Sequence, residues 1–106
     1  MEKVVRNGLV AVLYSPEYGA GWSTWNNREE GEMLLFHPLL VSWVESGKKE
    51  PIKEVLAKIT PNYESICTLG AQSLKIEWLA QGTSFEVKEF DGYESIQITE
   101  GLIYRT

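Results

Sequence analysis

The chain has 106 residues and a formal net charge of −5, with 10 Lys and Arg residues against 15 Asp and Glu residues. Its hydrophobic content of 43% and charged content of 24% are typical of a globular domain, and this length supports one hydrophobic core. We therefore expect a single domain over residues 1–106. The acidic balance, with no Lys/Arg cluster, argues against direct binding to duplex nucleic acid, which needs cationic side chains to displace counterions from phosphates.

Cysteine and histidine usage excludes several kinds of site. Cys67 is the only cysteine and His37 the only histidine, so the sequence supports neither an intrachain disulfide nor a thiolate zinc cluster. We expect no metal or other cofactor, a partly buried structural thiol at Cys67, and a helix-edge or packed imidazole at His37. The sequence shows no signal-peptide pattern and no apolar run of membrane-spanning length, which predicts no membrane partner and a reducing cytoplasmic location.

The first predicted element is a β-hairpin over residues 3–14. Asn7-Gly8 fits a two-residue type I′ turn, because both central residues of that turn need positive φ. The second arm, residues 9–14, is almost entirely apolar, which predicts a strand that is central in its sheet or covered on both faces. A long loop over residues 15–27 is predicted to follow.

Two short helices are predicted in the middle of the chain, after a polar connector at 28–32 and an apolar run at 33–36 that fits a strand or a helical turn. Pro38 and Pro51 suit helix starts, Gly47 suits the position after the first helix, and Thr60-Pro61 ends the second. The predicted buried faces are Leu39, Leu40, Trp43 and Val44 in the first helix and Ile52, Val55, Leu56 and Ile59 in the second.

The last third of the chain predicts a β-meander after an irregular segment at 60–72. Apolar and polar residues alternate over 74–79, 85–88 and 96–98, with tight turns at Gln81-Gly82 and Asp91-Gly92, and Leu102 and Tyr104 indicate a short last strand after Gly101. The predicted class is α+β. It has a mostly antiparallel sheet, made of the N-terminal hairpin and the C-terminal meander, with two short helices on one face.

The segment over residues 14–26 is the main candidate for a binding site, and we call it the aromatic-glycine loop. Glycines let a ligand approach the backbone and its N–H groups, aromatic faces stack on planar rings, and short polar side chains add hydrogen bonds. The predicted ligand-binding residues are Tyr14, Tyr18, Gly19, Gly21, Trp22, Ser23, Thr24, Trp25 and Asn26. The loop lacks the third glycine and the following helix of a dinucleotide fingerprint.

Two alternatives for this loop remain open. In one, Trp22 and Trp25 fill the core and the glycines serve only the geometry of the turns. In the other, the loop forms a contact surface for a second protein. Long loops in compact domains are usually functional or mobile, so the ligand site, the core-filling role and the protein contact surface all remain open interpretations.

A catalytic interpretation has less support in the sequence. Ser15, Ser23 and Thr24 are available as nucleophiles and His37 as an imidazole base, but no G-x-S-x-G elbow is present, and no catalytic residue is predicted. The candidate acid–base groups are carboxylates: Glu17, Glu77, Glu89, Asp91 and Glu94. Glu77 and Glu89 lie on predicted strands that are candidates for pairing, although solvent-facing charges explain both equally well.

The aromatic-glycine loop carries a resemblance to a known group of proteins. Tyr14-Ser15-Pro16, followed by residues 19–26, resembles a segment of small uncharacterised proteins of tailed bacteriophages and prophages. Residues 36–48, 74–78 and 82–96 are also similar. His37 and Phe90 stand where similar sequences have Asp and Tyr, and the family brings no assigned activity. The resemblance implies a phage gene product that acts in the host bacterial cytoplasm.

The leading functional hypothesis is a non-enzymatic binding module of phage origin. It would inhibit a host defence factor or sequester a nucleotide-type signal through the aromatic-glycine loop, so the expected partner is a host protein or a nucleotide-type small molecule. One alternative is a small hydrolase or nucleotide-processing enzyme that uses sheet-edge carboxylates, and another is a structural or virion-assembly protein. Sheet edges and exposed aromatic residues also permit a homo-oligomer.

Overall fold

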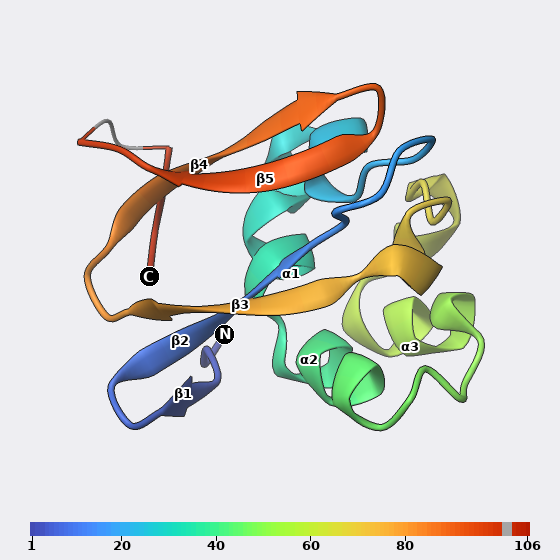
Figure 1. Ribbon diagram of the computed structural model, residues 1–106. Coiled ribbons are helices and arrows are strands. Elements are labelled where there is room, and N and C mark those ends of the chain that lie inside the picture. Colours follow the sequence, from blue (N-terminus) through green and yellow to red (C-terminus); the bar gives the residue numbers. More distant parts are fainter. Residues whose placement is uncertain (101–102) are drawn as a thin grey trace.

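The computed structural model describes residues 1–100 and 103–106 (Figure 1). Its strands and α-helices, in chain order, are β1 (Val5–Arg6), β2 (Leu9–Tyr14), α1 (Gly31–Phe36), α2 (Pro38–Glu45), α3 (Ile52–Ile59), β3 (Lys75–Ala80), β4 (Ser84–Phe90), β5 (Tyr93–Ile98) and β6 (Tyr104–Arg105). Single 3-10 turns occupy Ser23–Trp25, Arg28–Glu30, Tyr63–Ser65 and Ala71–Ser73. The α+β class is confirmed. The predicted roles of Gly101 and Leu102 concern residues outside the described ranges.

The strands form two antiparallel three-stranded sheets, with the orders β1-β2-β3 and β5-β4-β6. The predicted meander is therefore divided: β3 pairs with β2, and β4 pairs with β5 and β6. The three predicted tight turns next to a glycine are all present, at Asn7-Gly8, Gln81-Gly82 and Asp91-Gly92. Asn7 and Gly8 have φ of 53° and 77°, and Asp91 and Gly92 have φ of 52° and 88°, as the two central residues of type I′ turns require.

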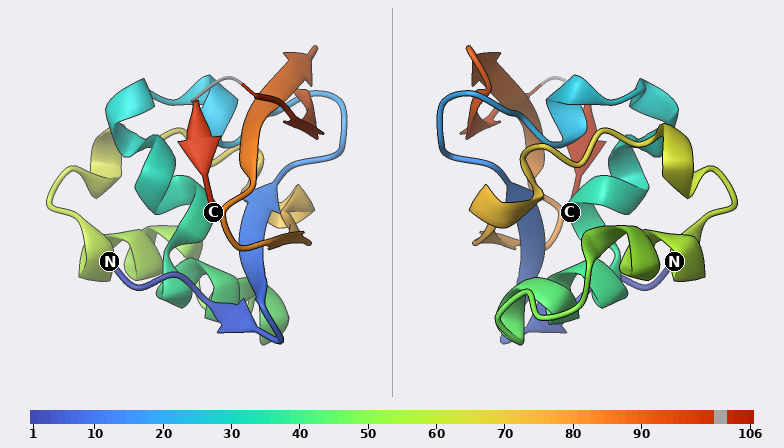
Figure 2. Two further views of the ribbon diagram at one scale, coloured as in Figure 1. Left: turned by 90° about the vertical axis from the view of Figure 1, so that its left-hand side faces the viewer. Right: turned by 90° about the vertical axis from the view of Figure 1, so that its right-hand side faces the viewer.

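The apolar sequence of β2 is explained by its position, because the strand is central in its sheet and buries side chains on both faces. Ala11 and Leu13 belong to one core cluster, which includes residues of all three helices or their neighbouring loops. Val10 and Val12 point the other way, into a second cluster with Leu35, Phe36 and Phe85. This arrangement confirms the prediction that the strand is covered on both faces. Figure 2 shows the helices gathered on one side of the strands.

The apolar run over residues 33–36, which fits a strand or a helical turn, belongs to helix α1. The predicted polar connector over residues 28–32 is wrong at its end. Gly31 already belongs to α1, after the 3-10 turn Arg28–Glu30. The helix lies between the two core clusters, with Leu34 in the first and Leu35 and Phe36 in the second. Three consecutive apolar residues are therefore buried, a pattern that gives no amphipathic period.

Helices α2 and α3 occur close to their predicted bounds. His37 accepts a hydrogen bond from the backbone N–H of Leu39 at 3.1 Å and caps α2, while Gly47 follows its end with φ of 92°. The predicted buried face of α2 is shifted: Val41 is buried and Leu39 is 44% exposed, because the helix packs against α3 as well as against β3. No helix in the described part of the chain is long and apolar enough to cross a bilayer.

Candidate binding surface

The aromatic-glycine loop lies beside the turn between β4 and β5 (Figure 1). Two backbone hydrogen bonds join them: the N–H of Gly19 donates to the carbonyl of Asp91, and the N–H of Glu94 donates to the carbonyl of Ser15, both at 2.8 Å. A Cβ at Gly92 would overlap the backbone nitrogen of Ala20, and this close approach needs a glycine. Residues about 70 positions apart in the sequence therefore form one surface unit.

Glu94 holds this unit together from inside. Its side chain is completely buried. One carboxylate oxygen accepts from the N–H of Ser15 at 2.8 Å. The other accepts from the N–H of Trp22 at 2.8 Å, from the N–H of Thr24 at 3.1 Å and from the Thr24 hydroxyl at 2.5 Å. A carboxylate offers only acceptors, which suits a loop whose donors point inward.

This arrangement corrects two expectations about chemistry at the loop. The backbone N–H groups of Ser15, Trp22 and Thr24 are occupied by Glu94, so they are not presented to a ligand. Glu94 lies on β5, an edge strand of its sheet, but it is not available as an acid–base group, because burial and four accepted hydrogen bonds commit its carboxylate to the loop. The sequence contained a hint of this burial, because Glu94 stands two residues before the apolar Ile96 and so lies on the same face of β5.

The two tryptophans of the loop have different environments. Trp22 is completely buried in the first core cluster, and its Nε1 donates to the carbonyl of Leu34 at 2.8 Å. The core-filling interpretation therefore describes Trp22, whose ring has no face open to a ligand. Trp25 is 38% exposed, and its Nε1 donates to the Glu89 carboxylate at 3.2 Å. Gly21 is needed beneath that ring, because a Cβ there would lie 2.6 Å from Cδ1 of Trp25.

Three aromatic rings gather on the outside of the unit, and we call Tyr18, Phe90 and Tyr93 the outer aromatic cluster. Tyr18 lies with its ring centroid 5.0 Å from that of Tyr93 and 6.4 Å from that of Phe90. Their exposed fractions are 68% for Tyr18, 73% for Phe90 and 39% for Tyr93. Tyr14 lies further in, where burial is the main cause of its raised pKa, followed by the charge of Glu77 and by Tyr93.

Glu89 stabilises the tip of the β4–β5 hairpin beside this cluster. Its carboxylate accepts from the N–H of Gly92 at 2.6 Å and from Trp25 Nε1. These two hydrogen bonds, the one from Gly92 being the stronger cause, lower the pKa of the Glu89 side chain from its ordinary value. The hairpin tip and Trp25 are thus linked through one exposed carboxylate.

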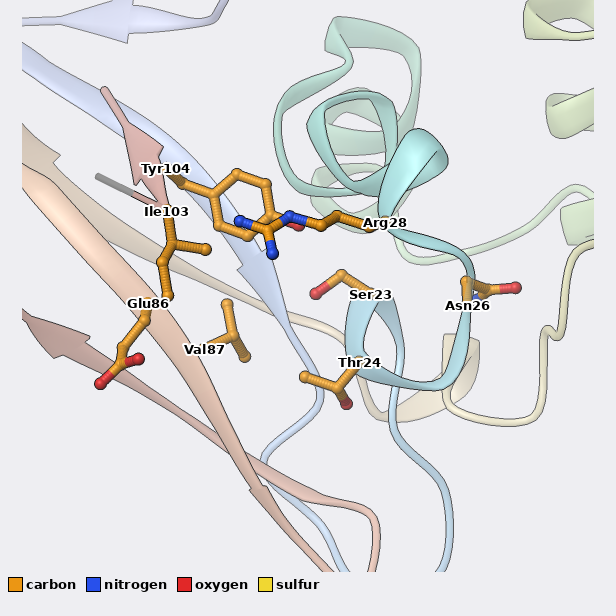
Figure 3. A pocket seen from close by; sticks show the side chains of 8 residues that line it. All are labelled: Ser23, Thr24, Asn26, Arg28, Glu86, Val87, Ile103 and Tyr104. Atoms are coloured by element: carbon orange, nitrogen blue, oxygen red, sulfur yellow. The ribbon is translucent and has the colours of Figure 1, made fainter. Parts of the chain in front are cut away.

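The inner side of the loop borders a cavity of about 210 Å³ that is open to solvent (Figure 3). Its lining residues are Ser23, Thr24, Asn26, Arg28, Glu86, Val87, Ile103 and Tyr104. Ser23 is only 6% exposed, and its hydroxyl has no hydrogen-bond partner among the described residues. Ser23, Thr24 and Asn26 were predicted as ligand-binding residues. Arg28 and Tyr104 were not, because a single cation in a polar stretch and a tyrosine far along the chain give no sequence signal.

Asn26, at the cavity rim, has a side chain whose hydrogen bonds are structural. Its side chain accepts from the N–H of Cys67 at 2.8 Å and donates to the carbonyl of Cys67 at 3.1 Å. It also donates to the carbonyl of Trp22 at 2.9 Å. These contacts fix the loop to the segment before β3.

The groups of the catalytic interpretation lie in separate places: Ser15 and Thr24 are hydrogen-bonded to Glu94 within the loop, whereas Glu77 and His37 lie on other elements. Glu77 on β3 pairs in register with Val12, whereas Glu89 on β4 pairs with Glu94, so the expected pairing of their strands is wrong. The buried Ser15 hydroxyl donates to the carbonyl of Ala20 at 3.0 Å. His37 caps α2, and burial is the first cause, with the N-terminal charge second, of its lowered pKa.

The comparisons with known proteins leave these observations to stand on their own. No protein-family model matches the chain, and no curated protein or solved structure is significantly similar to it. No group of three metal-ligating side chains occurs within residues 1–100 and 103–106. The outer aromatic cluster and the cavity are therefore the two features that bear on function.

Proposed function

We propose that the protein is a non-enzymatic binding module that contacts a protein partner through the outer aromatic cluster. The observation that supports this most directly is the exposure of two touching rings, Tyr18 at 68% and Phe90 at 73%. Contiguous exposed apolar surface marks interaction sites, and aromatic residues are enriched in the cores of protein interfaces.

The hydrogen bonds that join the two segments of the cluster favour a contact role. Tyr18 belongs to the aromatic-glycine loop, whereas Phe90 and Tyr93 flank the β4–β5 turn, and Glu94 and the Gly19–Asp91 hydrogen bond hold the two segments together. A surface that is ordered before binding loses little conformational entropy when the partner arrives. Tyr18 and Tyr93 already cover part of each other, which favours a broad protein surface over a planar molecule inserted between the rings.

We also propose a phage origin for the protein, from the resemblance of the aromatic-glycine loop, and with it a biological setting for this partner. We propose that it is a host protein of the bacterial cytoplasm and that binding inhibits a host defence factor. Glu17 and Asp91 are exposed in the same two segments, so we expect the partner to present an apolar patch with a basic rim. The cluster also permits self-association, which sedimentation of the purified protein measures.

A second function, capture of a nucleotide-type small molecule, is favoured by a different observation. The cavity on the inner side of the loop is lined by Ser23, Thr24 and Asn26, and it contains a buried hydroxyl without a partner among the described residues. The enzyme alternative has less support, because Ser15, His37 and Glu94 all have structural hydrogen bonds.

The first function is tested by comparing the proteins that co-purify with three tagged forms from bacterial cells. The double variant Tyr18→Ser/Phe90→Ser removes the two most exposed rings of the cluster. Ile98→Ser is the matched control, because Ile98 is also 73% exposed but lies at the other end of β5. We expect a host protein to be enriched with the unaltered chain and the control and lost with the double variant, while all three melt within a few degrees of one another. Equal recovery with the double variant would count against the proposal.

A further inference from the structure

The cavity beside the aromatic-glycine loop has unused hydrogen-bond donors of three kinds. The Arg28 side chain forms no ion pair or hydrogen bond with the described part of the chain, and neither does the Tyr104 hydroxyl. The Ser23 hydroxyl is buried and unpartnered in the same sense. Figure 3 shows the Ser23 hydroxyl and the Arg28 guanidinium directed into the same space, with the Tyr104 ring behind them.

The other polar groups that line the cavity are already occupied. The Thr24 hydroxyl donates to Glu94, and the Asn26 side chain bonds to the backbone of Trp22 and Cys67. Glu86, the one acidic side chain of the lining, pairs with Lys88 at 3.1 Å. Figure 3 shows its carboxylate directed away from Ser23 and Arg28. The free groups of the cavity are therefore a cation and two hydroxyls.

Packing against neighbouring residues fixes the position of Tyr104. The Tyr104 ring stacks on the buried Phe85 ring with centroids 5.7 Å apart. Its hydroxyl lies where a side chain at Gly31 would have to go, so only glycine there admits it. Burial is the main cause of the raised pKa of Tyr104, with Arg28 acting in the opposite direction, and the hydroxyl thus keeps its proton for donation near neutral pH.

We propose that this cavity binds the phosphate group of a small ligand, with Arg28 as the charged partner and the hydroxyls of Ser23 and Tyr104 as further donors. The inference rests on the second function above, ligand capture, and is independent of the outer aromatic cluster. A phosphate supplies acceptor oxygens in several directions, and a guanidinium fork binds two of them at once. A volume of about 210 Å³ holds several waters, which is enough room for a phosphate and part of its ester.

The proposal predicts that replacing Ser23 changes stability and phosphate affinity in different directions. A buried hydroxyl without a partner destabilises the fold, and Ser23→Ala should therefore leave the free energy of unfolding unchanged or raise it. The same change should weaken phosphate binding, because one donor is lost. If Ser23 had only a structural role, Ser23→Ala would not weaken phosphate binding in a chain whose stability is unchanged or higher.

The test is a titration of the full chain with AMP, adenosine and inorganic phosphate, followed by backbone amide NMR. We expect AMP and inorganic phosphate to shift the amides of Ser23, Arg28 and Val87 in a saturable manner, and adenosine to shift them far less. Arg28→Gln should weaken AMP binding at least about tenfold, since a hydrogen bond to a charged group is lost. Lys88→Gln is the matched control, because it removes a cation whose partner points away from the cavity.

Two results would overturn the inference in distinguishable ways. If adenosine binds as tightly as AMP, or Arg28→Gln binds AMP normally, the cavity captures a ligand but does not recognise phosphate. If none of the three compounds shifts these amides at millimolar concentration, and native mass spectrometry of protein taken from cells finds no retained small molecule, both the inference and the ligand-capture function fail.

Discussion

Replacement of Glu94 by Ala should remove the central support of the aromatic-glycine loop. The substitution leaves the three backbone N–H groups of Ser15, Trp22 and Thr24 without their acceptor, in a place where the carboxylate is completely buried. Each buried donor left unsatisfied costs about 1–3 kcal/mol, so the free energy of unfolding should fall by about 3–9 kcal/mol. The upper part of that range equals much of the stability of an ordinary domain, about 5–15 kcal/mol.

Glu94→Gln keeps the shape of the side chain and separates charge from packing. It retains one acceptor oxygen but turns an NH₂ group toward inward-pointing donors, and we expect an intermediate loss. Glu54→Gln, at an exposed position of α3, is the control and should change stability by less than about 0.5 kcal/mol. Urea unfolding followed by tryptophan fluorescence measures all three. This role of Glu94 is contradicted if the free energy of unfolding of Glu94→Ala lies within about 1 kcal/mol of that of the unaltered chain and the loop amides exchange no faster.

Three further changes test the packing of the loop and the cap of α2. Trp22→Ala should lower the free energy of unfolding by about 3–5 kcal/mol, because the ring is fully buried, and a fold of unchanged stability would place the ring outside the core. Gly92→Ala should destabilise the chain more than Gly8→Ala, because both have positive φ but only a Cβ at Gly92 meets the loop backbone, so equal losses in urea unfolding would refute the contact. Burial lowers the pKa of His37 in the folded chain, so its contribution to the free energy of unfolding is present above the ordinary pKa near 6.5 and is lost as pH falls through the lower folded pKa. NMR titration of this single histidine measures the shift. A pKa that is higher in the folded chain than in the unfolded chain would contradict the prediction.

Local signals were sufficient for most of the fold. The Asn7-Gly8 and Asp91-Gly92 turns depend on φ preferences of adjacent residues. The almost entirely apolar sequence of β2 predicts a strand that is central in its sheet or covered on both faces, and the strand is both. Sequence could not decide which strands pair, because pairing depends on long-range contacts. For that reason the division into two sheets, and with it the separation of Glu77 from Glu89, was missed.

The candidate site was predicted as a segment and not as an arrangement. The aromatic-glycine loop contains Tyr18 of the outer aromatic cluster and Ser23 of the cavity, but it also contains the core residue Trp22. The distinction depends on Glu94, more than seventy residues further along the chain than Trp22, which draws one part of the loop inward. Phe90 joins the site for the same reason, since the loop and the β4–β5 turn meet only in the folded chain.

The most direct test of the outer aromatic cluster as a contact surface is photo-crosslinking inside bacterial cells. A benzophenone amino acid is placed at Phe90 in one form of the chain and at Ile98 in another, two positions with the same exposed fraction of 73%. We expect light to link the Phe90 form to one defined host protein and to leave the Ile98 form without that product. The same product from both forms, or from Ile98 alone, would contradict the proposal that the protein contacts its partner through this cluster.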